Sequence, residues 1–164
     1  MPLTTGSKAP DFSLSHKHAE GLSLVTLSEH AGKSNVLLLF FPMVFTGVCT
    51  EEFCAISQRL TDYTSLDAVV LGISGDNPFA QEAWALKEAI TVPLLSDYEH
   101  KVTEAYGIAY EQFAPQFNLP MGGVAKRSAF IVDKAGVVQY AECSDDPTKL
   151  PNFAAIKAKL AELK

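Results

Sequence analysis

Hydrophobic residues occur in short blocks along the chain, separated by glycine, proline and polar turn residues. Two of these blocks are almost continuously apolar, Val36–Phe41 and Ala68–Ser74. Continuous runs of this length are typical of strands that are covered on both faces of a sheet, whereas half-exposed strands alternate. We therefore expect two buried, central strands.

Other segments place their apolar residues at helical spacing. Phe53, Ile56 and Leu60 recur at i, i+3 and i+7 and would line one face of a helix. Asp76-Asn77-Pro78 opens a second helix, since proline is favoured in a first turn, where its missing N–H costs nothing. Gly107 ends a short third helix. The predicted helices are Thr46–Tyr63, Pro78–Ala89, Val102–Tyr106 and Phe153–Leu163.

The remaining apolar segments are short and flanked by turn residues, as expected of strands in hairpins and sheet edges. They are Asp11–Ser15, Leu22–Leu27, Val92–Leu95, Ser128–Val132 and Val137–Tyr140. The first two form a predicted N-terminal β-hairpin, and the last two form an antiparallel hairpin around a turn at Asp133–Gly136. This order of elements predicts an α/β, thioredoxin-like fold with a central mixed β-sheet flanked by helices.

The chain length fits one domain with a sizeable core, and no repeat, linker or low-complexity stretch divides its 164 residues. We therefore expect a single domain over residues 1–164. A net charge of −6 without a Lys/Arg cluster argues against a nucleic-acid or anionic-membrane partner. The longest apolar run, Val36–Phe45, is about half of the roughly 20 residues that span a bilayer. Because Met1–Phe12 lacks an apolar signal region, we expect a cytoplasmic protein.

Three cysteines are too few for a disulfide-built scaffold, and at least one must be unpaired. In a reducing compartment such cysteines are usually structural, metal-binding or catalytic. No Cys-x-x-Cys or spaced histidine pair supplies four zinc ligands, and we expect the four histidines, which lie in polar turns or helix ends, to be solvated. The sequence therefore predicts no metal site and no other cofactor.

The setting of Cys49 favours a reactive thiolate. A buried strand ends at Phe41, Pro42 turns the chain, and a helix begins with Thr46 as a suitable N-cap. Cys49 would then be the third helical residue, beside unpaired N–H groups and the positive end of the helix dipole. Both stabilise the thiolate, which is the nucleophilic form. The same donors, the Thr46 hydroxyl and a cation from elsewhere would stabilise the charge that develops during attack on an O–O bond.

Three segments resemble the peroxiredoxin family, and they lie in order along nearly the whole chain. Pro42-x-x-x-Thr46-x-x-Cys49 matches the active-site motif of that family. Gly6–Phe12 looks like its opening segment, and Arg127–Asp133 looks like its arginine-bearing strand.

The resemblance implies a thiol-dependent peroxidase that reduces hydrogen peroxide or organic hydroperoxides, with Cys49 as the attacking residue that becomes a sulfenic acid. It also implies that Arg127 is the distant cation, that Pro42 shields Cys49 from solvent, and that Glu52 joins a hydrogen-bond network around the pocket. The implied reductant is thioredoxin, glutaredoxin or a small thiol, and the implied assembly is a homodimer.

Cys54 follows Cys49 by five residues, and its role is open. On an intact helix the spacing is a rise of about 7.5 Å, whereas a disulfide needs Cα atoms within roughly 7 Å, so the bond requires unwinding. The spacing resembles the bacterioferritin-comigratory (Q-type) peroxiredoxins, in which the second cysteine resolves the sulfenic acid. Phe40–Cys49 and Ser144–Pro147 instead resemble the alkyl hydroperoxide reductase E-type group, which usually works with one cysteine. We favour a resolving Cys49–Cys54 disulfide over a structural Cys54.

Two further functions use the same thiol. A general thiol–disulfide oxidoreductase is disfavoured, because Cys49 and Cys54 do not form Cys-x-x-Cys. A peroxide-sensing redox protein would be oxidised without turnover. Cys143 lies beyond the last predicted strand without a family-like setting, and we expect it to be a bystander.

Overall fold

The fold is built on one mixed seven-stranded sheet with the order β2-β1-β5-β4-β3-β6-β7. The structure, a computed structural model, describes residues 1–118 and 120–164. β3 pairs in parallel with β4 and antiparallel with β6. The strands are β1 (Ser13–His18), β2 (Gly21–Thr26), β3 (Asn35–Phe40), β4 (Ala68–Ser74), β5 (Leu94–Ser96), β6 (Ser128–Val132) and β7 (Val138–Cys143). The predicted mixed sheet and N-terminal hairpin are confirmed.

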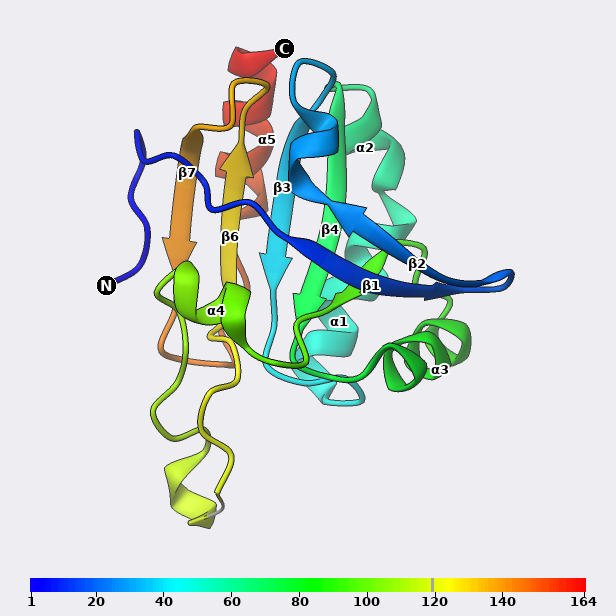
Figure 1. The fold of residues 1–164 in the computed structure, drawn as a ribbon, viewed down its shortest axis with the longest axis vertical. Helices are drawn as coiled ribbons and strands as arrows, with labels where there is room; N and C mark the ends of the chain where they lie inside the picture. Colours follow the sequence, from blue (N-terminus) through cyan, green and yellow to red (C-terminus); the bar gives the residue numbers. More distant parts are fainter. Residues whose placement is uncertain (119) are drawn as a thin grey trace.

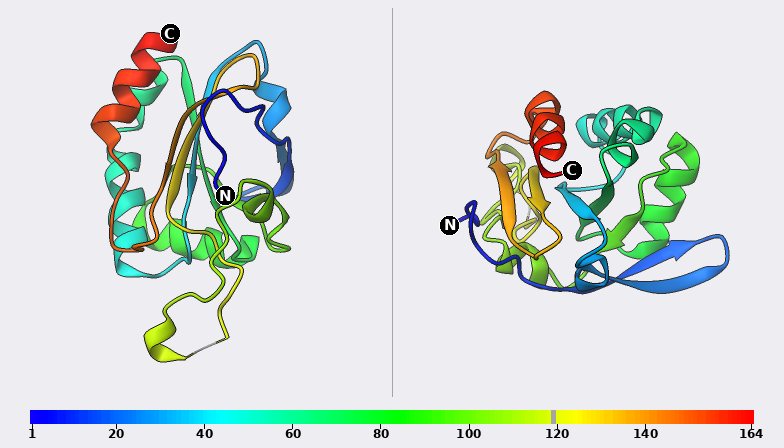
Figure 2. Two further views of the ribbon diagram at one scale, coloured as in Figure 1. Left: turned by 90° about the vertical axis from the view of Figure 1, so that its left-hand side faces the viewer. Right: turned by 90° about the horizontal axis from the view of Figure 1, so that it is seen from above.

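Helices cover both faces of this sheet (Figures 1 and 2). They are α1 (Gly47–Gln58), α2 (Leu60–Thr64), α3 (Pro78–Glu88), α4 (Lys101–Ala105) and α5 (Phe153–Leu163), with 3-10 helices η1 (Leu27–His30) and η2 (Pro115–Phe117). α1, α2, α3 and α5 pack on one face, while α4, η1 and the N-terminal segment pack on the other. None of the described helices is long and apolar enough to cross a bilayer.

The continuous apolar run in β3 is explained by this double cover. Leu37 and Leu39 belong to the cluster beneath α1, α3 and α5, whereas Leu38 and Phe40 belong to the cluster beneath α4. All six residues of β3 are buried. Because successive side chains point to opposite faces, a strand with helices on both sides has no solvent-facing position for a polar residue.

The prediction of a single helix over Thr46–Tyr63 is wrong in one respect, because the helix is interrupted at Arg59. This residue has φ −120° and ψ 22°, outside the helical region, and its N–H donates to the Ile56 carbonyl in a tighter turn. Leu60 and Tyr63 of α2 nevertheless pack against the same apolar cluster as Ile56. The apolar spacing therefore continues across the break, and the spacing alone could not indicate it.

The other differences from the predicted bounds are shifts of a few residues. β1 and β2 pair in full register from Ser13 to His18 and from Gly21 to Thr26. Backbone pairing at the exposed edge of the sheet therefore extends these strands into polar positions that burial would not indicate. β5 is shifted to Leu94–Ser96, where Ser96 pairs with both Ser74 and Ser15.

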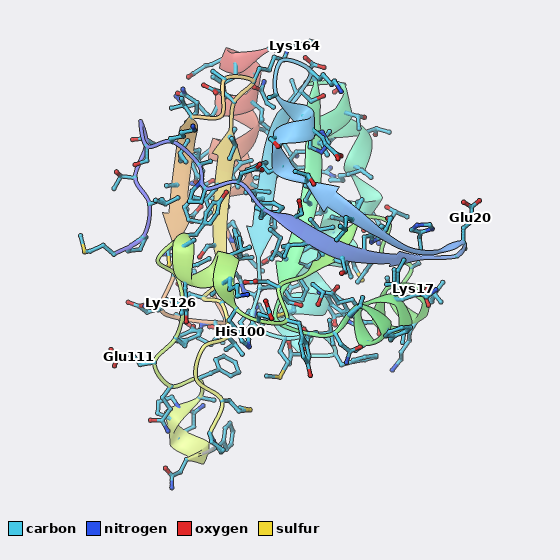
Figure 3. All side chains as sticks on the ribbon, viewed as in Figure 1. Lys17, Glu20, His100, Glu111, Lys126 and Lys164 are labelled. Carbon is cyan, nitrogen blue, oxygen red and sulfur yellow. The ribbon has the colours of Figure 1, made fainter. Side chains whose placement is uncertain are left out.

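A long segment between α4 and β6 projects from the body (Figure 1). We call residues 109–118 and 120–125 the arm. Its base is a short antiparallel ladder, in which Tyr110 N–H donates to Val124 O at 2.9 Å and Gly123 N–H donates to Tyr110 O at 2.7 Å. Figure 3 shows Glu111 on the arm, and Lys126 and His100 where the arm meets the body.

Candidate active site

Cys49 lies in the first turn of α1. This helix begins near the end of the sheet at which β3 and β4 finish and β6 starts (Figure 1). The Thr46 backbone is extended (φ −92°, ψ 149°) and α1 begins at Gly47, so Cys49 is the third helical residue, as predicted. Among the backbone hydrogen bonds of the described residues, none uses the N–H groups of Gly47, Val48 or Cys49. These free donors and the helix dipole favour negative charge at the sulfur.

The Thr46 hydroxyl does not cap the helix, which corrects the prediction of an N-cap side chain. It donates instead to the Met43 carbonyl at 2.8 Å, within the loop that joins β3 to α1. The oxygen keeps its lone pairs, so it can still accept a hydrogen bond from a bound molecule. The loop thereby orients the hydroxyl. The backbone N–H groups in the first turn of α1 receive no hydrogen bond from the Thr46 side chain.

Arg127, immediately before β6, brings the cation to Cys49. Its Nη2 lies 3.0 Å from the Cys49 Sγ, and its Nη1 lies 2.9 Å from Glu52 Oε2. Its Nε donates to the Pro147 carbonyl at 3.1 Å. With 2% of the side chain exposed, the guanidinium is held in one orientation by three partners, two on α1 and one in the segment after β7.

Glu52 is completely buried on the face of α1 that also carries Cys49. Its Oε1 has no hydrogen-bond partner among the described residues. Burial raises the pKa of the Glu52 carboxyl to about 7, although the Arg127 charge and hydrogen bond oppose that rise. Burial would lower the pKa of Arg127, but the neighbouring Glu52 and Cys49 raise it. Near neutral pH the guanidinium is therefore shared between Cys49 and a carboxyl that is only partly ionised.

The sulfur itself is shielded from bulk water. Cys49 is 1% exposed and belongs to the apolar cluster that includes Phe41, Val44 and Phe53. Pro42, between Phe41 and the loop, is also buried. In such surroundings electrostatic interactions are stronger than in water, so the Arg127 charge stabilises a thiolate more than it would at the same distance in water.

Cys54 is not brought to Cys49 in this structure. Both thiols are free and lie on the continuous helix α1. The Cys54 Sγ faces α3, where it donates to the Glu88 carbonyl at 3.5 Å. Burial, and then the charge of Glu88, raise the pKa of the Cys54 thiol. Cys54 therefore rests as a protonated thiol beside the core and needs a conformational change to reach Cys49.

Cys143 and the histidines lie apart from this site. Cys143 ends β7 opposite Ser128 and packs in the cluster on the other face of the sheet from Cys49. The expectation of solvated histidines is wrong for His16, whose Nδ1 contacts the Leu94 carbonyl at 3.0 Å, and for His100, whose Nδ1 is buried. Within residues 1–118 and 120–164, no three His, Cys, Asp or Glu side chains are grouped as metal ligands.

One contact to the loop was missed by reasoning from the sequence. Asp76 was expected only to open α3, but Asn77 is the N-cap, and its side chain accepts from Ala80 N–H. The Asp76 carboxylate instead accepts from Val44 N–H at 3.0 Å. No local spacing relates residues 44 and 76, because their contact arises only when β3 and β4 pair.

Comparison with known proteins gives a consistent result over most of the chain. The model of the AhpC/TSA family matches residues 5–141, a span that includes Pro42, Thr46, Cys49 and Arg127. The chain is 37% identical over 142 residues to alkyl hydroperoxide reductase E of Mycobacterium tuberculosis, and the match covers 85% of each protein.

Solved structures extend this likeness to the fold. The crystal structure of peroxidoxin BcpB from Mycobacterium tuberculosis has a TM-score of 0.83 at 25% identity, with 99% of each chain covered. A peroxiredoxin-like protein from Aquifex aeolicus has a TM-score of 0.85 at 25% identity, covering 100% of this chain and 90% of the other.

Proposed function

Since this chain is a peroxiredoxin of the AhpC/TSA family and therefore a thiol-dependent peroxidase, we propose that Cys49 is the residue that attacks the peroxide. The observation that carries this assignment is the 3.0 Å contact between Arg127 Nη2 and Cys49 Sγ. Among the described residues, neither Cys54 nor Cys143 makes a hydrogen bond to a cationic side chain. Only Cys49 therefore combines a cation, a helix start and free N–H donors.

In the proposed first step, the Cys49 thiolate attacks the distal peroxide oxygen. An S–O bond forms while the O–O bond breaks, so the sulfur is oxidised to a sulfenic acid and the peroxide is reduced. The leaving oxygen departs as hydroxide or alkoxide and takes a proton to give water or an alcohol. Arg127 is close enough to stabilise negative charge first on sulfur and then on the leaving oxygen.

The other site residues fix the peroxide in line with the sulfur. The lone pairs of the Thr46 hydroxyl would accept from the peroxide O–H, because the hydroxyl proton is already given to Met43. The N–H groups of Val48 and Cys49 would donate to the peroxide oxygens. Pro42 would keep water from the sulfur, and Glu52 would hold the Arg127 fork in its plane.

We propose that Cys54 resolves the sulfenic acid by a Cys49–Cys54 disulfide after α1 opens locally. The Cys54 sulfur attacks the Cys49 sulfur, an S–S bond forms, and the S–O bond breaks. The sulfenic oxygen leaves as water, taking the proton of the Cys54 thiol. The opening must move Phe53, which is fully buried with its ring 4.6 Å from that of Phe41. Losing such packing costs on the order of 3 kcal/mol, which leaves the open helix as a minor state.

The packing of Phe53 also supports a second route, in which an external thiol resolves Cys49 and α1 stays folded. In both routes thioredoxin, glutaredoxin or a small thiol is the proposed final reductant, which requires a reducing compartment. The substrate is hydrogen peroxide or an organic hydroperoxide.

A homodimer is the proposed assembly. Three exposed aromatic residues follow the carboxyl ends of neighbouring strands, namely Phe45 after β3, Phe79 after β4 and Tyr98 after β5. Exposed aromatic residues gathered along one edge are typical of interfaces. Sedimentation velocity should give twice the mass of one chain, and a monomer at micromolar concentration would contradict the dimer.

The assignment of Cys49 is tested by turnover with a dithiol reductant. Cys49→Ser should lose peroxide consumption, while Cys143→Ser, a change at the thiol on the other face of the sheet, should keep it. If Cys49→Ser retained wild-type turnover, the assignment would be wrong.

A further inference from the structure

Beyond Phe41, the backbone N–H groups of the loop between β3 and α1 make one hydrogen bond to another segment of the described chain. Phe41 N–H still pairs with the Ile73 carbonyl, but the chain then leaves β4. From Pro42 to Thr46, the one backbone N–H that bonds to another segment within the described residues is that of Val44, which donates to Asp76 Oδ2 at 3.0 Å. Beyond the apolar packing of Val44, the loop is thus tied to another segment by the hydrogen bond to a single side chain.

The Asp76 carboxylate is fixed by a buried polar network. Its Oδ2 accepts from Ser74 Oγ at 2.7 Å, and Ser74 Oγ accepts from Gln81 Nε2 at 2.9 Å. Gln81 Nε2 also donates to the Leu95 carbonyl, and Ser96 Oγ donates to the Asp76 carbonyl at 2.6 Å. Ser74, Gln81 and Ser96 are at most 6% exposed. The network joins β4, α3 and β5, so the carboxylate is held by rigid elements.

The anchored residue precedes the most constrained part of the loop. Phe45 has φ 64°, in the left-handed region that non-glycine residues disfavour, and it is followed by Thr46. A conformation of this kind persists only when surrounding contacts hold it. The bond from Asp76 to Val44 acts on the residue directly before Phe45, and it is charge-assisted, hence stronger than a neutral bond.

We propose that Asp76 is a positioning residue for the peroxidase reaction, which holds the Thr46 hydroxyl in register with Cys49 through Val44 N–H. The inference rests on the proposed role of Cys49. Among the described residues, no hydrogen bond joins Asp76 to the sulfur or to Arg127. The cation is held separately, because Arg127 bonds to Glu52 and to the Pro147 carbonyl. Loss of the Asp76 bond should therefore loosen the peroxide-binding loop and leave the pairing of sulfur with guanidinium in place.

The test compares two reactions of Cys49 in the same protein. Oxidation by hydrogen peroxide needs the loop geometry, whereas alkylation by iodoacetamide needs only an accessible thiolate. In Asp76→Ala the peroxide rate constant should fall on the order of tenfold to a hundredfold, since a misplacement of about 1 Å can cost that much. Alkylation of Cys49, followed by peptide mass, should be as fast as in wild type or faster.

Conservative and matched variants complete the test. Asp76→Asn keeps an oxygen acceptor for Val44 N–H and should restore most of the peroxide rate. Asp62→Ala, at an exposed carboxylate of α2, should match wild type in both reactions. If Asp76→Ala does not fold, Asp76→Ser replaces it, since the shorter side chain cannot reach Val44.

The proposal is overturned if the variant without the carboxylate keeps the wild-type peroxide rate, or if oxidation and alkylation slow in parallel, which would show a collapsed site. Either result leaves the role of Cys49 intact. Peroxide turnover by Cys49→Ser would instead remove the premise.

Discussion

At the scale of single residues, Arg127 connects the chemistry with the scaffold. Its three nitrogen donors contact Cys49, Glu52 and the Pro147 carbonyl, which come from α1 and from the segment after β7. A lysine has one compact ammonium group and cannot reproduce this planar fork. The cation is therefore positioned as well as charged, and in the proposed mechanism both properties would stabilise the transition state.

Arg127→Gln should lower the second-order rate constant for peroxide on the order of a hundredfold or more, because it removes the cation beside the sulfur and the leaving oxygen. Arg127→Lys should recover part of this loss. Rapid-quench mass spectrometry of Cys49 oxidation measures the effect. Arg59→Gln, an exposed arginine at the helix break, is the matched control, and equal rates for all of these proteins would refute the role of Arg127.

At the scale of elements, helix α1 has two requirements that conflict. Its first turn must stay intact to present free N–H groups beside Cys49, while a Cys49–Cys54 disulfide requires that turn to open. Phe53 lies between the two cysteines in the sequence, and its buried ring stabilises the folded helix. How the enzyme is recycled therefore depends on the stability of one helical turn.

One equivalent of peroxide should convert wild type into a species lighter by two hydrogens, as measured by intact mass under non-reducing conditions. Cys54→Ser should instead stop at a gain of one oxygen, because no second thiol lies on α1. Cys143→Ser should behave as wild type. A stable gain of one oxygen in wild type, unchanged by Cys54→Ser, would establish resolution by an external thiol.

Much of the fold could be predicted because it follows from burial. β3 and β4 are covered on both faces, and their sequences are almost continuously apolar for that reason. The break at Arg59 could not be predicted, because Leu60 and Tyr63 keep the apolar spacing beyond it.

The site also contains residues that the sequence could indicate and contacts that it could not. The residues that belong to one local motif, from Pro42 to Cys49, could be identified by spacing. The resemblance to a family supplied Arg127 and Glu52, and the structure places both against each other. The direction of the Thr46 hydroxyl and the Asp76 bond to Val44 depend on tertiary contacts, which leave no periodic signal in the sequence.

At the scale of the whole molecule, the buried Glu52 couples the site to folding stability. Its pKa is raised from 4.5 to about 7 in the folded state, chiefly by burial. Between these values the folded chain holds a proton that the unfolded chain has lost, so stability should fall as pH rises from about 4.5 to 7 and level off above. A shift of this size corresponds to roughly 3 kcal/mol.

Glu52→Gln should remove this component, so the difference in unfolding free energy between variant and wild type should move in favour of the variant across that pH range. Urea unfolding at a series of pH values measures it. Glu51→Gln, an exposed neighbour on α1, should follow the wild-type profile. Parallel curves for wild type and Glu52→Gln would contradict the burial effect.

The central claim is that peroxide oxidises Cys49 first. The most direct measurement treats Cys54→Ser, in which the sulfenic acid persists, with one equivalent of hydrogen peroxide and a dimedone-type trap, and then maps the label by peptide mass. The account predicts the label on Cys49 within the first turnover, and much slower labelling of Cys49 when Arg127 is replaced by Gln. A label on Cys143, with Cys49 unmodified, would contradict it.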